Sequence, residues 1–204
     1  MEYLKENEFP LNGIEFDGLC DLTLDNQQFS LAIEIQKEKS ERDLPFNFTM
    51  ISRMCHYMRD NKVEQYEVIR FFDKVILPVK DKVTFNTTIL NFLLSILMRY
   101  DLMGSIFDEI LAIETPLDAA RVNLMINYYS KQQKHYEAYK FLMGIEDNIH
   151  GYKVQATNLI EHYTVKGDTR RAVKIYRKLV SIQAEVLSID YTNILKSFAS
   201  QKKY

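Results

Sequence analysis

A repeat of roughly 34 to 35 residues runs along this chain and constrains its fold more than any other feature. Tyr129 and Ala138 in one unit correspond to Tyr163 and Ala172 at the same places in the next. Each unit has room for two helices and a turn, and a single helix hairpin cannot bury its own apolar face. The repeat therefore predicts hairpins that stack on one another and share one apolar core.

Small residues recur early in the second helix of most units. We expect the two helices of a hairpin to cross closely at these points, because a side chain larger than methyl would push them apart. Val68 takes this place in the second unit, whose turn is longer than the others. The predicted crossing residues are Ala32, Gly104, Ala138 and Ala172.

Prolines and an unfinished last unit mark the ends of the repeats. Pro45, Pro78 and Pro116 fall between units, where a proline would stop the second helix. The helix that closes the chain is either a solvating cap, or the chain is a fragment of a longer array. The predicted units are 14–45, 46–82, 83–119, 120–153 and 154–188, followed by a lone helix over 189–203.

Composition agrees with a helical chain. Apolar residues make up 47%, and six glycines and four prolines are few helix breakers for a chain of 204 residues. We therefore predict an all-α fold, a right-handed superhelical array of antiparallel helix hairpins. This α-solenoid would hold about five repeats and a terminal helix in one domain over residues 1–204.

Residues for catalysis, metal binding or membrane insertion do not converge. The four histidines have no zinc-type spacing with Cys20 or Cys55, which we expect to be reduced thiols in the core or at its boundary. The longest apolar stretch, Ile89–Met98, is too short to span a bilayer. Gly167–Thr169 ("GDT") fits a turn with Asp168 or Thr169 as helix N-cap. The sequence predicts a protein that is not an enzyme and has no metal site, cofactor or membrane span.

Charge is distributed unevenly between the two ends. The net charge is −2, but residues 151–204 carry ten Lys and Arg against four Asp and Glu. The last quarter of the chain is therefore at +6 and residues 1–150 are at −8. A nucleic acid would bind the basic C-terminal part, because phosphate contacts need Lys and Arg. The alternative is that Arg170–Lys178 form a solvated helix face.

The helix openings resemble those of the pentatricopeptide-repeat family. "VTFNTTI" (Val83–Ile89) and "VNLMI" (Val122–Ile126) are similar to the family's opening of the first helix, Val-Thr-Tyr-Asn-x-Leu-Ile. "KGDTRRAVKIYRKLV" (Lys166–Val180) is similar to its glycine turn and second helix. The resemblance covers nearly the whole chain, from the first predicted unit to the terminal helix. It implies binding of single-stranded RNA in mitochondria, in mRNA stability, maturation or translation.

In that family each repeat reads one base, chiefly through the residue before the apolar pair of the first helix. The resemblance places three hydrogen-bonding side chains there: Thr87, Asn158 and Asn193. Lys153 and Lys196 flank the two asparagines and would meet phosphate. Since Asn158 and Asn193 lie one repeat apart, both are expected to point into one groove. The other equivalent positions, Gly18, Met50 and Leu124, have no hydrogen-bonding side chain.

A helical-repeat scaffold that binds protein without RNA is the alternative. Asp17, Asp21 and Asp25 are spaced for one helix face and would suit a basic partner docked on residues 14–60. A positive groove would favour RNA, whereas a neutral or acidic groove with exposed Tyr and Phe would favour protein. The partner's identity and the oligomeric state are left open by the sequence.

Overall fold

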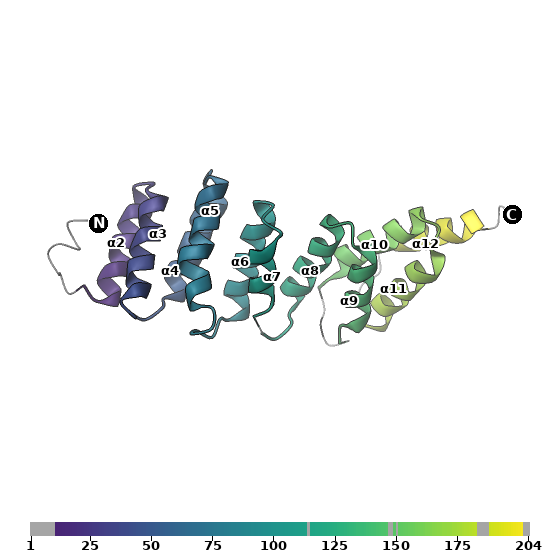
Figure 1. Cartoon of the computed structure of the whole chain (residues 1–204). Helices are drawn as coiled ribbons and strands as arrows, with labels where there is room; N and C mark the ends of the chain where they lie inside the picture. The colour runs from purple at the N-terminus through teal and green to yellow at the C-terminus, as the bar shows by residue number, and fades with distance from the viewer. Residues whose placement is uncertain (1–10, 114, 147–148, 150, 183–187, 202–204) are drawn as a thin grey trace. The chain divides into compact units, whose positions relative to one another are not determined.

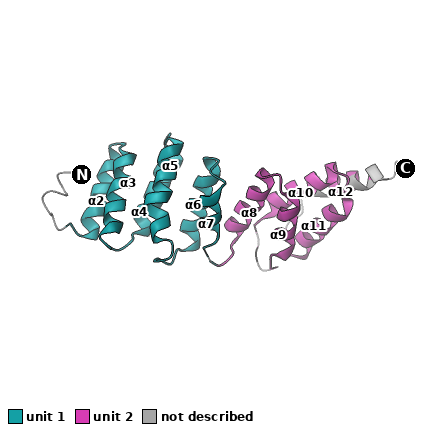
Figure 2. Cartoon of the chain, in the orientation of Figure 1, with its two compact units in different colours: residues 1–115 teal, residues 116–204 magenta. Residues whose placement is uncertain are grey.

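The computed structural model describes residues 11–113, 115–146, 149, 151–182 and 188–201. Every regular element in these residues is a helix (Figure 1), which confirms the all-α prediction. The chain divides into two compact units, residues 1–115 and residues 116–204 (Figure 2). One continuous array over the whole chain stays a prediction.

Unit 1 consists of three helix hairpins. The second hairpin is irregular, because α5 continues into a π-helical turn, η1, and a short 3-10 helix, η2. Pro78 lies within η2, so the prediction that it separates two units was wrong there. Its missing N–H costs little in the first turn of a short helix. The elements are α2 (Gly13–Asp25), α3 (Phe29–Glu41), α4 (Phe48–Asp60), α5 (Gln65–Phe71), η1 (Phe72–Ile76), η2 (Leu77–Val79), α6 (Thr87–Arg99) and α7 (Ser105–Leu111).

Unit 2 consists of two hairpins and the terminal helix. Each hairpin fits inside its predicted repeat to within a few residues. The first helices of successive repeats pack on one another, α8 on α10 and α10 on α12, and the second helices α9 and α11 do the same. The elements are α8 (Ala119–Lys131), α9 (His135–Gly144), α10 (Lys153–Val165), α11 (Thr169–Ser181) and α12 (Ser188–Gln201).

Short polar side chains begin these helices. The side-chain oxygens of Asn12, Asn47, Asn86 and Asp118 each accept a hydrogen bond from a backbone N–H of the helix that follows. Asp168 does the same for α11, which confirms it as the predicted N-cap. Such caps satisfy N–H groups that have no partner inside the helix.

The turn inside a hairpin repeats in four of the five hairpins. One residue in each turn is left-handed, with φ of 59° at Gln27, 57° at Asp101, 59° at Gln133 and 73° at Gly167. The amide of the residue after it donates to the carbonyl five residues earlier, as in a Schellman motif. In the α4–α5 hairpin the extended Asn61 ends the helix instead. These four turns therefore fix the register of the repeats.

The predicted crossing residues are confirmed at three positions and wrong at one. Ala32, Ala138 and Ala172 are fully buried, as is Val68. Gly104 is instead an exposed N-cap of α7, and a Cβ built on it would touch nothing within 4 Å. Because Gly suits both a close crossing and a helix N-cap, its presence could not tell the two apart.

Candidate nucleic-acid interface

The four repeated turns identify which residues of the first helices are equivalent. Counting nine residues back from each left-handed residue gives Gly18, Phe92, Leu124 and Asn158. Among them, Asn158 has a hydrogen-bonding side chain, and it is exposed on α10. Its amide can both donate to and accept from a base edge. Asn158 therefore presents a hydrogen-bonding amide to solvent from α10.

Thr87 is not at the equivalent position, so its assignment was wrong in register. It is the half-buried first residue of α6 and follows the N-cap Asn86. Phe92 takes the place of Asn158 in this helix, and its ring lies 4.8 Å from that of His56. The Asn of "VTFN" caps the helix instead of lying inside it, which moves the equivalent position from Thr87 to Phe92.

Asn193 is also misplaced, because the terminal helix is shifted by one position from the predicted register. Its side chain is buried, with 7% exposed, whereas Asn158 is exposed. Asn193 takes the place of the buried Leu159 of the preceding repeat, and the exposed Thr192 takes the place of Asn158. The expectation that Asn158 and Asn193 face one groove is therefore wrong.

The solvent-exposed side chains of the first helices α10 and α12 in unit 2 form a surface that is close to neutral and partly apolar. Lys153 is half-buried at the start of α10, and Lys196 is exposed on α12. The exposed stripe of α10 holds Asn158 and Glu161 between two valines. Large apolar side chains are prominent on α10 and α12: Val154 (62% exposed), Val165 (83%), Tyr191 (58%) and Leu195 (58%).

The second helices of unit 2 carry a basic outer surface. Together α9 and α11 hold six Lys and Arg and one acidic residue, Glu137. Arg170, Lys174 and Arg177 are exposed, and none of them forms an ion pair with an acidic side chain of the described residues. Lys178 differs, because its ammonium donates to the Ile145 carbonyl at 2.6 Å and ties α11 to the preceding loop.

Tyrosine rings surround Arg171, which lies next to this basic surface on α11. The guanidinium carbon of Arg171 lies 5.0 Å from the ring centre of Tyr136, 5.8 Å from that of Tyr139 and 5.6 Å from that of Tyr163. The ammonium of Lys140 lies 4.8 Å from the Tyr136 ring. Arg171 also forms an ion pair with Asp168. The sequence did not reveal the aromatic part of this cluster, since α9, α10 and α11 each contribute to it.

Two histidines stack beside the tyrosines. The rings of His135 and His162 are 3.6 Å apart, and the Tyr163 hydroxyl donates to the His135 carbonyl at 2.9 Å. Burial lowers the pKa of both imidazoles, and nearby Lys166 lowers it further. The His162 pKa is also lowered by His135, because two charged rings in contact repel.

We expect the chain to lose stability as the pH falls through the histidine range. A lowered folded-state pKa means that the unfolded chain binds protons more readily, so this stability is present above the unfolded pKa of about 6.5 and is lost below it. Urea unfolding at about pH 7.5 and about pH 5.5 measures the difference. This difference in stability should shrink in His162→Gln. An equal pH dependence in the wild type and His162→Gln would contradict this assignment.

The acidic face predicted on α2 is paired inside unit 1. Arg53 on α4 lies 3.0 Å from Asp21 and 2.7 Å from Asp25. Asp17 lies 2.7 Å from the Lys39 ammonium, and Lys39 is only 3% exposed. These carboxylates therefore join neighbouring helices, which leaves less negative charge on residues 14–60 for a basic partner than the sequence suggested.

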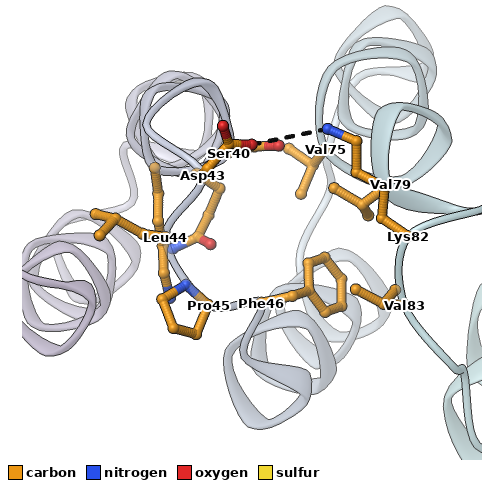
Figure 3. Close-up of a pocket in the computed structure, with 11 residues that line it drawn as sticks. Ser40, Asp43, Leu44, Pro45, Phe46, Val75, Val79, Lys82 and Val83 are labelled. Atoms are coloured by element: carbon orange, nitrogen blue, oxygen red, sulfur yellow. Dashed lines mark ion pairs between the residues drawn. The ribbon is translucent and has the colours of Figure 1, made fainter.

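A pocket of about 210 Å³ lies in unit 1 between the end of α3 and the second hairpin (Figure 3). Valine, leucine and phenylalanine side chains form much of its wall, and Lys82 lies 3.8 Å from Asp43 beside it. The buried Lys39 also lines it. The labelled residues are Ser40, Asp43, Leu44, Pro45, Phe46, Val75, Val79, Lys82 and Val83.

Reactive groups are not assembled in the part of the chain that the structure describes. Cys20 and Cys55 are free and buried, and burial raises the pKa of each thiol to about 12. At neutral pH such thiols are protonated and unreactive. The described residues contain no group of three His, Cys, Asp or Glu placed to hold a metal ion. None of the described helices is both long and apolar enough to cross a membrane.

No model of a protein family matches the sequence, and no curated protein sequence matches it. What the chain binds is therefore inferred from its own residues and from the resemblance of its helix openings.

Proposed function

We propose that this chain is a helical-repeat protein that binds single-stranded RNA and that unit 2 makes the main contact. Binding, not catalysis, is the proposed activity. The concentration of exposed basic side chains on α9 and α11 carries the proposal. The resemblance of the helix openings to pentatricopeptide repeats adds the class of ligand. It also adds the proposed setting, a mitochondrial role in mRNA stability, maturation or translation.

The repeated hairpins support this proposal. Equivalent Schellman turns recur at Gln133 and Gly167, and successive first helices pack on one another in unit 2. Stacked hairpins of this kind present the same helix face at regular intervals, which suits an extended ligand built of repeating units, such as an RNA strand. We propose that the hairpins form a right-handed α-solenoid, with RNA as the extended ligand.

Charge supports the choice of unit 2. Residues 151–204 are at +6, whereas residues 1–150 are at −8, and Asp17, Asp21 and Asp25 of α2 are paired with Lys39 and Arg53. Because phosphate binding depends on Lys and Arg and weakens with salt, an RNA strand would prefer the basic unit. The chain has no comparable concentration of basic residues elsewhere in its sequence.

We expect the purified chain to bind a labelled, unstructured RNA at low salt. Affinity should fall steeply between about 50 and about 200 mM salt, because each phosphate contact to a single strand contributes a slope of roughly −0.7. Fluorescence anisotropy measures the affinity and its dependence on salt. An RNA duplex of the same length serves as the comparison ligand. Crosslinking in cells followed by sequencing would identify the transcripts. Binding no stronger than that of an acidic control protein at about 50 mM salt would contradict the proposal.

A protein-binding scaffold is the second candidate, favoured by one observation. The first helices of unit 2 expose Val154, Val165, Tyr191 and Leu195 around a nearly neutral surface. Apolar and tyrosine side chains are typical of protein interfaces and contribute little to phosphate binding. Mass spectrometry of proteins that co-purify with the chain, before and after RNase treatment, separates a direct protein partner from one held by RNA.

A further inference from the structure

We propose that the RNA strand lies across the outer face of the second helices, with one base stacked on Tyr136 and phosphates on the basic side chains around it. This inference rests on the proposed function and states where and how RNA is held. The outer face is defined by five exposed residues of α9 and α11: Tyr136, Lys140, Arg170, Lys174 and Arg177.

The repeat places these side chains on one continuous surface. Tyr136 and Arg170 take the same position on successive second helices, and so do Lys140 and Lys174. The helices α9 and α11 pack against each other. Along α11, Arg170 and Lys174 are separated by about 6 Å, since each helical residue rises about 1.5 Å. Positive charges therefore follow one another along the face.

Tyr136 gives this face an aromatic platform. Its side chain is 47% exposed, and the Lys140 ammonium and the Arg171 guanidinium both lie over the ring, so a stacking base would displace the exposed Lys140. Arg171 is fixed by its ion pair with Asp168 and by the rings of Tyr139 and Tyr163, so the platform is ordered before a ligand arrives. Exposed rings among cationic side chains bind single-stranded nucleic acids by base stacking and backbone attraction.

The first helices of unit 2 do not offer the same chemistry. Asn158 can meet a base edge, but Glu161 lies on the same exposed stripe and Val154 and Val165 flank it. The half-buried Lys153 and the exposed Lys196 are the basic side chains of α10 and α12. A phosphate backbone therefore meets more positive charge on α9 and α11 than on α10 and α12.

Two sets of variants of the full chain test the inference by RNA anisotropy. Arg170→Gln, Lys174→Gln and Arg177→Gln together should weaken binding of all unstructured RNAs and reduce the salt slope by about 2. The control removes the same charge from the first helices by Lys131→Gln, Lys153→Gln and Lys196→Gln, and should leave the slope nearly unchanged. All six sites are polar and at least partly exposed, so circular dichroism should show intact helices.

A second pair of variants tests the aromatic platform. Tyr136→Ala should weaken RNA binding roughly 5- to 150-fold, the effect of losing one stacked base, while Tyr136→Phe should retain it. Tyr191→Ala removes a tyrosine exposed on α12 and serves as the control. A loss of binding in Tyr191→Ala but not in Tyr136→Ala would overturn the inference.

The outcomes also separate this inference from the proposed function. If the wild-type chain does not bind RNA, the proposed function fails. If it binds RNA and the first-helix control set weakens binding more than the second-helix set, RNA binding stands and the outer face is the wrong surface. If an acidic peptide such as polyglutamate binds as tightly as RNA and Tyr136→Ala changes neither affinity, the face is an acidic-protein docking surface.

Discussion

Asp17→Ala should lower the free energy of unfolding by about 3–5 kcal/mol, the largest stability effect that we expect for a single substitution. The Asp17 carboxylate lies on α2 and meets the Lys39 ammonium of α3 at 2.7 Å. It also accepts hydrogen bonds from Gln36 at 3.2 Å and from Asn47, the N-cap of α4, at 2.6 Å. One side chain therefore joins three helices of unit 1.

The expected loss is large because Lys39 cannot reach water easily. Its side chain is 3% exposed, so removing Asp17 leaves a buried ammonium without its counter-charge. Asp25→Ala on the same helix is the matched control. Its carboxylate is 66% exposed and pairs with Arg53, so its loss should cost at most about 1 kcal/mol. Urea unfolding followed by circular dichroism measures both variants.

A double substitution separates the buried charge from simple loss of contacts. Asp17→Leu combined with Lys39→Met removes both charges and should restore much of the stability lost in Asp17→Ala, since buried ion pairs often tolerate apolar replacement. Equal losses in Asp17→Ala and Asp25→Ala would contradict the assignment of Asp17 as the centre of a buried network.

Ala172→Leu should cost about 1–3 kcal/mol by overpacking the crossing of α10 and α11. Ala172 is fully buried in α11, among the core residues of unit 2. The larger leucine side chain has no space there unless the helices move apart. The equivalent Ala138 of α9 is also fully buried and should respond in the same way.

Ala120→Leu is the matched control for Ala172→Leu. Ala120 is exposed on α8 of the same unit, so the same change in volume meets solvent and should alter stability by at most about 0.5 kcal/mol. Urea midpoints of the two variants against the wild type measure the difference. An Ala172→Leu protein as stable as Ala120→Leu would show that the two helices do not cross closely at that alanine.

Much of the fold was predictable from the sequence because the apolar pattern repeats. Recurrence of Ala138 as Ala172 marked two close crossings, and Asp168 indicated the start of α11. Helix boundaries followed the predicted units closely, apart from the continuation through Pro78. These features depend on local chemistry, such as capping and steric bulk at a crossing, so single residues reveal them.

The register of the binding positions was less predictable, because the sequence signal for the turns is weak. Gly167 is the one glycine among the four left-handed turn residues. Asp101 is of a type that tolerates this conformation, but the residue types of Gln27 and Gln133 do not predict it. When the turns are not known, the third repeat is aligned by its "VTFN" motif. That alignment puts Thr87, instead of Phe92, at the position equivalent to Asn158. Asn193 was misplaced by one position, which is enough to turn a helix side chain from the surface into the core.

The basic and aromatic face needed the three-dimensional structure. The basic residues of α11 were visible in the sequence, but their position next to Tyr136 depends on how α9 packs on α11. The signal that could have found it is the correspondence of Tyr136 with Arg170 in the next repeat. Tyr163 and Asp168, which hold Arg171 in place, come from α10 and the turn after it.

Photocrosslinking of the chain to an unstructured RNA with 4-thiouridine, followed by mass spectrometry of the crosslinked peptides, tests the central claim most directly. We predict crosslinks within residues 135–144 and 169–181, with Tyr136 as a principal site and loss of that site in Tyr136→Ala. Crosslinks concentrated on residues 153–165 and 188–201 would place RNA on the first helices and contradict the proposed surface. Absence of crosslinks at low salt would contradict RNA binding itself.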